Sequence, residues 1–259
     1  MNYLEYILLG IVQGLTEFFP ISSSGHLLLL RKLFGIADGG LIIEVALHLG
    51  TLLSILFFWK KFISEKIKET INGDFNYLLI IILGSIPASI IGLLFEDKIK
   101  EYFFDINSMD YLIICYIFLT ILIFSTKYFI NNKGTKISYL AALLIGLAQA
   151  TAILPGLSRS GLTIFMALLL GLSFKKAMQF SFMLAIPILI FSSTYLIFNN
   201  IELLLLDTSF LLELLAGILS SFIIGYSVLF ILKKIIDEGK FWYFSIYCFM
   251  ITLVLYYAN

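Results

Sequence analysis

The sequence predicts an all-α polytopic membrane protein with six transmembrane helices and two re-entrant helix–loop–helix hairpins, arranged as an inverted repeat. The composition is the first reason: 61% of the 259 residues are hydrophobic and 13% are charged, whereas soluble domains carry about 25% charge. The second is that several apolar runs reach the roughly 20 residues that a helix needs to cross a bilayer. The third is that two further apolar regions are interrupted in a similar way.

Six uninterrupted apolar runs predict complete spans. They lie at about 41–59, 76–95, 110–130, 177–198, 209–232 and 242–258. Residues 3–34 are instead interrupted by Glu17, Pro20 and a serine run, and residues 137–172 are interrupted between Pro155 and Thr163. Because the pieces beside each break are short, each region is predicted to enter and leave on the same side of the membrane. Such backbone is tolerated at depth where protein or a cavity surrounds it.

The distribution of lysine and arginine predicts the orientation. Twelve of the seventeen lie in loops 60–75, 127–136, 173–176 and 233–241, so the positive-inside rule places these loops in the cytoplasm and both termini outside. A single complete span over 137–172 would move the last two loops to the outside. Two complete crossings would leave the later loops on the same side of the membrane as a hairpin does, and the short pieces favour the hairpin.

An internal repeat accounts for the paired interruptions. Gly10-x-x-Gln13 leads to Pro20 and Ser22-x-Ser24-Gly25, and Gly146-x-x-Gln149 leads to Pro155 and Ser158-x-Ser160-Gly161. Gly84 and Gly217 continue the correspondence further along the chain. We therefore expect one membrane domain, 1–259, with halves 1–130 and 137–259 that each hold a hairpin and three spans. Three is odd, so the halves have inverted topology, and the two broken segments are expected to meet at a site near the midplane.

The second interruption has the chemistry of an anion site. Arg159 lies in apolar sequence, where an arginine costs at least ~3 kcal/mol unless a partner or water satisfies it. Its planar guanidinium suits phosphate oxygens, and serine-rich helix starts offer free N–H groups to an anion. The residues expected to bind substrate in this way are Gln13, Ser22, Ser24, Gly156, Ser158, Ser160 and Thr163. The alternative for Arg159 is a structural salt bridge to Glu17.

Acids and a histidine near the first interruption are the candidate catalytic groups. Gln13 and Glu17 are four residues apart and share a helix face, and an acid inside an apolar run needs a cation, a metal or a proton. His26, beside the serine run, is a candidate nucleophile or general acid/base near neutral pH. Glu44, four residues before His48, is a candidate to hold a divalent ion together with Glu17, or a structural residue near the outer interface.

These segments resemble a known family. The run from Gln13 to His26 resembles the first signature of the undecaprenyl-diphosphate phosphatases of the bacitracin-resistance type, and Leu154 to Thr163 is similar to the second, Pro-Gly-x-Ser-Arg-Ser-x-x-Thr. The family pattern allows Glu or Gln at position 13, and the glutamine here weakens a metal-ligand role. The resemblance implies hydrolysis of undecaprenyl diphosphate to undecaprenyl phosphate and inorganic phosphate, which recycles the lipid carrier for cell-wall synthesis and confers bacitracin resistance. It also implies Mg²⁺ or Ca²⁺, membrane lipid as a partner, a homodimer, and a site opening to the outer side of the bacterial plasma membrane.

Carried over to this sequence, the resemblance implies that Glu17, Ser23, His26 and Arg159 are the central residues. A covalent phosphoenzyme and direct attack by water both remain open. A transporter or flippase for a polyprenyl-phosphate lipid would also suit an inverted repeat, but it does not require an acid, a serine and a histidine together. A phosphatase of the phosphatidic-acid type shares Ser24-Gly25-His26 but has a second histidine that is missing here. No basic stretch is suited to nucleic acid.

Overall fold

The computed structural model describes residues 3–34, 40–103, 110–129, 134, 136–199 and 208–258, and over these ranges the chain is helical, with no strand. The α-helices are α1 (Tyr3–Thr16), α2 (Ser23–Phe34), α3 (Gly40–Phe58), α4 (Lys60–Ile71), α5 (Asn76–Phe103), α6 (Asp110–Ser125), α7 (Tyr139–Thr151), α8 (Arg159–Leu169), α9 (Phe174–Asn199), α11 (Thr208–Asp237) and α12 (Phe244–Ala258). Two 3₁₀ turns, η1 (Thr126–Phe129) and η2 (Phe241–Tyr243), extend α6 and precede α12.

Four helices are long and apolar enough to cross a membrane, by length and composition. They contain Asn76–Phe95, Asp110–Phe129, Phe174–Tyr195 and Thr208–Asp237. A fifth span is reached if α3 is joined to α4, from which it is bent by 76°. The remaining predicted span, 242–258, is helical, but α12 has only 15 residues. A multi-pass helical membrane protein is therefore confirmed, and the exact count of six spans stays a prediction.

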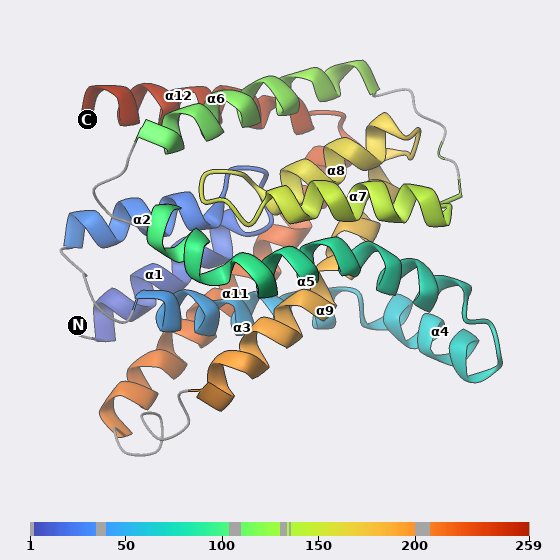
Figure 1. The fold of residues 1–259 in the computed structure, drawn as a ribbon, viewed down its shortest axis with the longest axis horizontal. Helices are drawn as coiled ribbons and strands as arrows, with labels where there is room; N and C mark the ends of the chain where they lie inside the picture. The colour runs from blue at the N-terminus through green and yellow to red at the C-terminus, as the bar shows by residue number, and fades with distance from the viewer. Residues whose placement is uncertain are drawn as a thin grey trace.

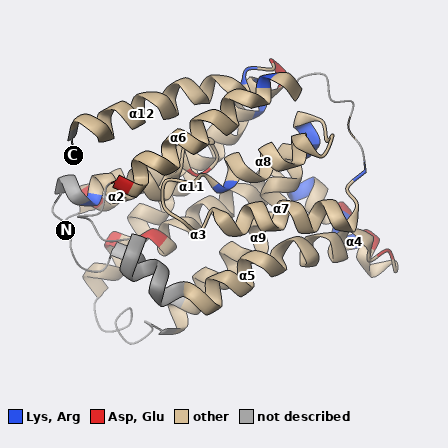
Figure 2. Cartoon of the chain, turned by 45° about the horizontal axis from the view of Figure 1, so that its top comes forward, with Lys and Arg blue, Asp and Glu red and all other residues tan. Residues whose placement is uncertain are grey.

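The surface has the character expected of a chain surrounded by lipid. Large apolar side chains such as Leu94, Ile114 and Phe198 are exposed, and an exposed apolar surface of this extent marks a membrane-facing protein. Charged residues gather toward the helix ends, and the middle of the bundle is mostly without them (Figure 2). The start of α1 and the end of α12 lie at the same end of the molecule (Figure 1).

Both interrupted regions form a pair of short helices joined by a loop, as the sequence predicts. In the first, α1 and α2 flank residues 17–22; in the second, α7 and α8 flank residues 152–158. Ser138 begins α7 by accepting a hydrogen bond from the Ala141 N–H at 3.1 Å, as a serine cap does. Two of these short helices pack along long ones, α1 along α11 and α7 along α5.

Glycines allow these two close packings. A Cβ added to Gly10 would lie 2.2 Å from the carbonyl oxygen of Gly217, and one added to Gly146 would lie 2.2 Å from that of Gly84. The four glycines that mark the sequence repeat therefore meet as two pairs, each joining one half of the chain to the other. No larger residue fits at Gly10 or Gly146 unless the helices separate, so both loops are held at a fixed place in the bundle.

Candidate active site

The two loops meet at the centre of the molecule, which confirms the predicted juxtaposition (Figure 1). The Ser160 hydroxyl donates to the carbonyl oxygen of Phe19 at 3.2 Å. A Cβ on Gly161 would lie 3.2 Å from the Pro20 Cβ, so the start of α8 rests directly on the first loop. Chain segments about 140 residues apart thus form one site.

The two helices that start here are capped in the same way. The Ser22 hydroxyl accepts from the Gly25 N–H at 3.3 Å, and the Ser158 hydroxyl accepts from the Gly161 N–H at 3.2 Å. Each cap satisfies only part of the first turn, because the first N–H groups of a helix have no partner within it. The starts of α2 and α8 therefore both offer backbone donors and a positive helix end to an anion.

Two residues in these loops have φ values in the left-handed region. Gly156 adopts φ +89° and Ser22 adopts φ +66°. Glycine takes this conformation without cost, whereas a serine is strained by it, as residues at functional sites often are. Ser22 turns the chain so that the next residue, Ser23, begins α2 with its side chain toward Glu17.

Glu17 is the centre of the polar cluster. Its Oε1 accepts a hydrogen bond from Arg159 Nη2, and its Oε2 accepts from Gln13 Nε2 at 3.0 Å and from Ser23 Oγ at 2.6 Å. His48 Nε2 lies 3.4 Å from the same Oε2. The carboxylate is nearly inaccessible, since 5% of the Glu17 side chain and 17% of the Arg159 side chain are exposed. The structure confirms the salt bridge between Arg159 and Glu17, and the binding of phosphate by Arg159, the first residue of α8, stays a prediction.

Two polar atoms in this cluster are left for a ligand. Arg159 Nη1 and Gln13 Oε1 are buried and have no hydrogen-bond partner within the described part of the chain. A buried donor without a partner costs about 1–3 kcal/mol, so an anion or water beside Nη1 would relieve a real penalty. Gln149, the counterpart of Gln13 in the second hairpin, has both polar side-chain atoms in the same condition.

His48 is the site residue that the sequence reasoning missed. The sequence relates His48 only to Glu44, four residues before it. In the structure its ring reaches Glu17 from α3, and its Nδ1 lies 2.6 Å from the carbonyl oxygen of Glu44. Both ring nitrogens therefore face oxygen acceptors, which a doubly protonated imidazole satisfies. The sequence does carry a signal for this role of His48, because an ionisable residue within an apolar span is functional by default. His48 is also one of only two histidines in the chain.

His26 lies in a different environment from the one we predicted. Its Nδ1 lies 2.7 Å from the carbonyl oxygen of Ser22, and its Nε2 is 2.8 Å from the Tyr247 hydroxyl. The Tyr247 ring stacks on it at 5.7 Å, and the Tyr116 hydroxyl is 3.1 Å from Nδ1. In the described structure His26 makes no hydrogen bond to Glu17 or Arg159; it faces α6 and α12 beside the cluster.

Two predicted substrate-binding residues, Thr163 and Gly156, make contacts within the fold. Thr163 is fully buried, and its hydroxyl is bonded to the Arg159 carbonyl oxygen at 2.7 Å and to Ser181 at 2.6 Å. It joins α8 to α9 and does not line the loop. Gly156 packs against α6, because a Cβ there would lie 2.8 Å from the Cys115 Cβ. These contacts do not themselves point to substrate, and the predicted role of both residues in substrate binding stays a prediction.

The remaining serines lie at the helix starts. The Ser24 hydroxyl is 3.3 Å from that of Ser22, and the Ser160 hydroxyl is 3.1 Å from that of Ser158. Each pair lies within the first turn of α2 or α8, at the place where an anion would approach the free N–H groups. The predicted role of these four residues in substrate binding is compatible with this position and stays a prediction.

The donor set does not fit a resident divalent cation in the predicted form. Glu44 is paired with Arg31, whose Nη1 is 3.1 Å from its Oε1, and both oxygens of Glu17 accept hydrogen bonds. Within the described ranges no group of three or more His, Cys, Asp or Glu residues is placed to hold a metal. The Arg31 guanidinium already lies beside Glu44, so this arrangement does not support the pairing of Glu17 with Glu44 around an ion, which stays a prediction.

The fold and the site together define a polytopic helical membrane protein with a buried cluster of an acid, a serine and an arginine between two loops. The chain belongs to the family described as bacitracin resistance protein BacA, whose family model matches residues 6–254. It is similar to proteins named undecaprenyl-diphosphatase from several organisms. The one from Methanococcus vannielii is 39% identical over 262 residues, covering 98% of this chain and 100% of the relative. Those from Thermosipho africanus and Bacteroides thetaiotaomicron are 38% and 35% identical, covering 99% and 96% of this chain and 100% and 96% of the relatives.

Proposed function

We propose that this protein is an undecaprenyl-diphosphate phosphatase, which releases inorganic phosphate from the C55 isoprenoid diphosphate and returns the monophosphate carrier to cell-wall synthesis. Membership of the BacA family and the names of the full-length relatives support this reaction. The observation that carries the proposal is the contact of one acid with both a serine and an arginine at two facing helix starts. A site for binding alone would need the arginine and the helix starts, but not a serine hydroxyl directed at a carboxylate.

In the proposed complex, the diphosphate lies between the starts of α2 and α8. Arg159 Nη1, which has no partner in the described structure, donates to the terminal phosphate together with N–H groups of both helix starts. Stabilising the charge on a transferring phosphoryl group is the main part of catalysis in this reaction class. The prenyl tail stays in lipid and packs on the exposed apolar faces of the helices.

Ser23 is the proposed nucleophile and Glu17 its base, because their 2.6 Å hydrogen bond is within the range of an activated hydroxyl. Ser23 Oγ forms a bond to the terminal phosphorus while Glu17 Oε2 takes the hydroxyl proton. The bond from phosphorus to the bridging oxygen breaks, and its electron pair leaves with undecaprenyl phosphate. Water then attacks the phosphoserine, the serine oxygen regains a proton, and inorganic phosphate departs. Direct attack by water activated by Glu17 is the alternative.

Protonation of Glu17 has a second consequence in this scheme. A neutral carboxyl group holds a guanidinium less strongly than a carboxylate does, so Arg159 is released toward the phosphoryl group as its charge develops. His48 Nε2, 3.4 Å from Oε2, helps to keep this oxygen in place. His26 and the Tyr247 hydroxyl, 2.8 Å apart, form a pair that can pass a proton to or from the site near neutral pH.

The same reading extends to the membrane arrangement. We propose six spans and two re-entrant hairpins in two inverted halves, with both termini and the opening of the site on the outer side, and a homodimer in the membrane. The crosswise glycine contacts and the matching serine caps of the two hairpins support the repeat. The lysine-rich loops support the orientation through the positive-inside rule.

Phosphate release by the purified full-length protein tests the reaction. With C55 diphosphate as substrate, Glu17→Gln, Ser23→Ala and Arg159→Lys are each expected to lower kcat/KM at least about a hundredfold. The matched control is Ser192→Ala, which removes a hydroxyl whose one hydrogen bond among the described residues is to a carbonyl oxygen of its own helix, α9. If the wild type releases no phosphate, or if Arg159→Lys is as active as the control, a transporter or flippase becomes the better reading.

Rapid quenching with ³²P-labelled substrate separates the two chemical routes. Label that stays on the protein in acid and is absent from Ser23→Ala supports a phosphoserine, whereas label that is stable only in alkali supports a phosphohistidine. Protein without label at any time point, in an enzyme that turns over, indicates direct attack by water.

A further inference from the structure

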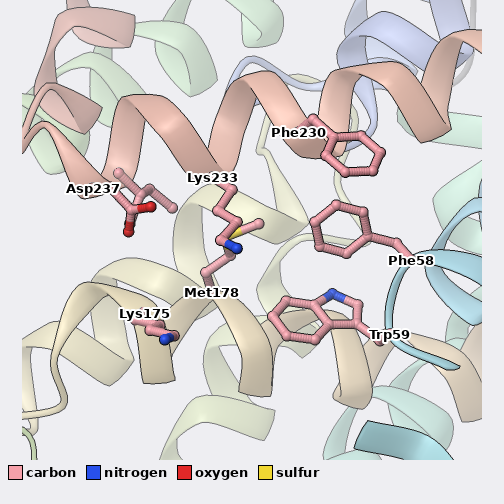
Figure 3. A pocket seen from close by; sticks show the side chains of 8 residues that line it. Phe58, Trp59, Lys175, Met178, Phe230, Lys233 and Asp237 are labelled. Atoms are coloured by element: carbon pink, nitrogen blue, oxygen red, sulfur yellow. The ribbon is translucent and has the colours of Figure 1, made fainter. Parts of the chain in front are cut away.

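A hollow lined by apolar side chains, two lysines and an aspartate lies away from the Glu17 cluster. It has a volume of about 230 Å³ and is lined by Phe58, Trp59, Lys175, Met178, Phe230, Lys233, Ile236 and Asp237. Lys175 and Lys233 come from α9 and α11 and lie on one side, and the rings of Phe58 and Trp59 face them from the other (Figure 3). Its volume is below the ~300–1,000 Å³ typical of sites that enclose a drug-sized molecule, so it suits a compact headgroup.

The charged groups of this hollow are available to a ligand. Within the described structure no ion pair is formed by the three charged residues of the hollow, Lys175, Lys233 and Asp237. Two ammonium groups and one carboxylate give a formal charge of +1, which complements a singly charged anion. The Trp59 indole N–H adds a donor that is buried and has no partner among the described residues, and an indole nitrogen can only donate.

The location of the hollow indicates the depth at which a ligand would lie. It sits where α3 ends and the chain bends by 76° into α4, a helix that carries Lys60, Lys61, Lys66 and Lys68. A tryptophan at the end of a span, followed by a basic amphipathic helix, is typical of the boundary between headgroups and acyl chains. The exposed ring of Phe230 on the rim gives an acyl chain an apolar surface to follow.

We propose that this hollow binds the phosphodiester headgroup of an anionic membrane phospholipid on the lysine-rich side of the protein. The phosphate lies between the two ammonium groups and accepts from the Trp59 N–H, while the acyl chains leave over Phe230 into the bilayer. A lipid is favoured over a free phosphate compound because most of the lining residues are apolar and one of them, Phe230, is itself exposed on the outside of α11. The lysine-rich side is the one that faces anionic lipid in a cell membrane.

Tryptophan fluorescence of the full-length protein in nanodiscs provides the test. The chain has two tryptophans, so Trp242→Phe leaves Trp59 as the only emitter. Phosphatidylglycerol brominated near the start of its acyl chains is titrated into phosphatidylcholine discs and compared with phosphatidylcholine brominated at the same positions. One lysine near a membrane surface favours an anionic lipid by about fivefold, so phosphatidylglycerol is expected to quench at a mole fraction at least about fivefold lower.

A matched pair of variants makes the result specific. Lys175→Gln/Lys233→Gln is expected to abolish the preference for phosphatidylglycerol. Lys176→Gln/Lys234→Gln removes the same charge one position along each helix, outside the hollow, and is expected to keep it. Equal loss in both double variants, or no preference in the parent protein, would overturn the proposal. Relief of this quenching by soluble glycerol phosphate would assign the hollow to a free phosphate compound, and would equally overturn the proposal.

Discussion

Substituting either member of the pair between Glu17 and Arg159 is expected to destabilise the protein, and the structure predicts which substitution costs more stability. Two unit charges about 4 Å apart interact by about 4 kcal/mol at an effective dielectric constant near 20, and removing one partner of a buried pair costs about 3–5 kcal/mol. Glu17→Gln leaves Arg159 near His48 without the acid between them. Arg159→Met leaves Glu17 with His48, Gln13 and Ser23 still directed at it. Glu17→Gln should therefore cost more stability than Arg159→Met.

The double variant Glu17→Gln/Arg159→Met separates stability from catalysis. Because it leaves no unpaired charge of the original pair, it should recover about 2 kcal/mol or more relative to the sum of the single variants, as residues in one network do. Its activity should stay at least about a hundredfold below wild type. Unfolding by a denaturing detergent and phosphate release measure the two quantities. Additive losses of stability would refute the energetic coupling, and activity in the double variant would refute the assigned roles.

Three other changes test separate parts of the structure. Tyr247→Phe removes the hydroxyl bonded to His26 at 2.8 Å. The kcat for phosphate release should fall about fivefold, the value of one hydrogen bond, with little change in KM. An unchanged kcat would exclude the proton relay through His26 and Tyr247. Gly146→Ala places a Cβ 2.2 Å from a backbone oxygen of α5 and should lower the unfolding free energy by about 1–3 kcal/mol. In the control Gly92→Ala the added Cβ has no neighbouring atom within 4 Å, so this variant should be neutral or stabilising. Activity is expected to need Mg²⁺ or Ca²⁺ in an EDTA titration, and Glu44→Gln should leave the required cation concentration unchanged; a large rise would restore Glu44 as a ligand.

The sequence was sufficient for those features that depend on local chemistry. Hydropathy and helix-breaking residues located both hairpins, because a proline and a serine run interrupt an apolar helix wherever it lies. The serine caps at Ser22 and Ser158 follow from the same local rule. The meeting of the two loops also followed, since a repeat with paired interruptions has a common meeting point.

Pairings between distant segments could not be read in the same way. Two histidines lie near acids in the sequence, and the sequence alone favoured His26, because it adjoins the serines. Which ring reaches Glu17 depends on the rotation of α3 against the first hairpin, and the structure brings His48 there. The partner of Glu44 was missed for a similar reason: Arg31 lies on α2, and its distance from Glu44 is set by how α2 packs against α3.

The proposed repeat also explains why one acid suffices for the site. Aligning the two serine-capped helix starts puts Ser22 opposite Ser158, so that the next residues, Ser23 and Arg159, occupy equivalent positions. Both turn toward Glu17, and they bind its two different oxygens. The residue that would match Glu17 in the second hairpin, 136 positions later, is Ile153. A second carboxylate there would repel a diphosphate and compete for Arg159. The repeat therefore gives the anion two similar helix starts, those of α2 and α8. The two halves differ at the next residue, which is the proposed nucleophile Ser23 on α2 and the cation Arg159 on α8.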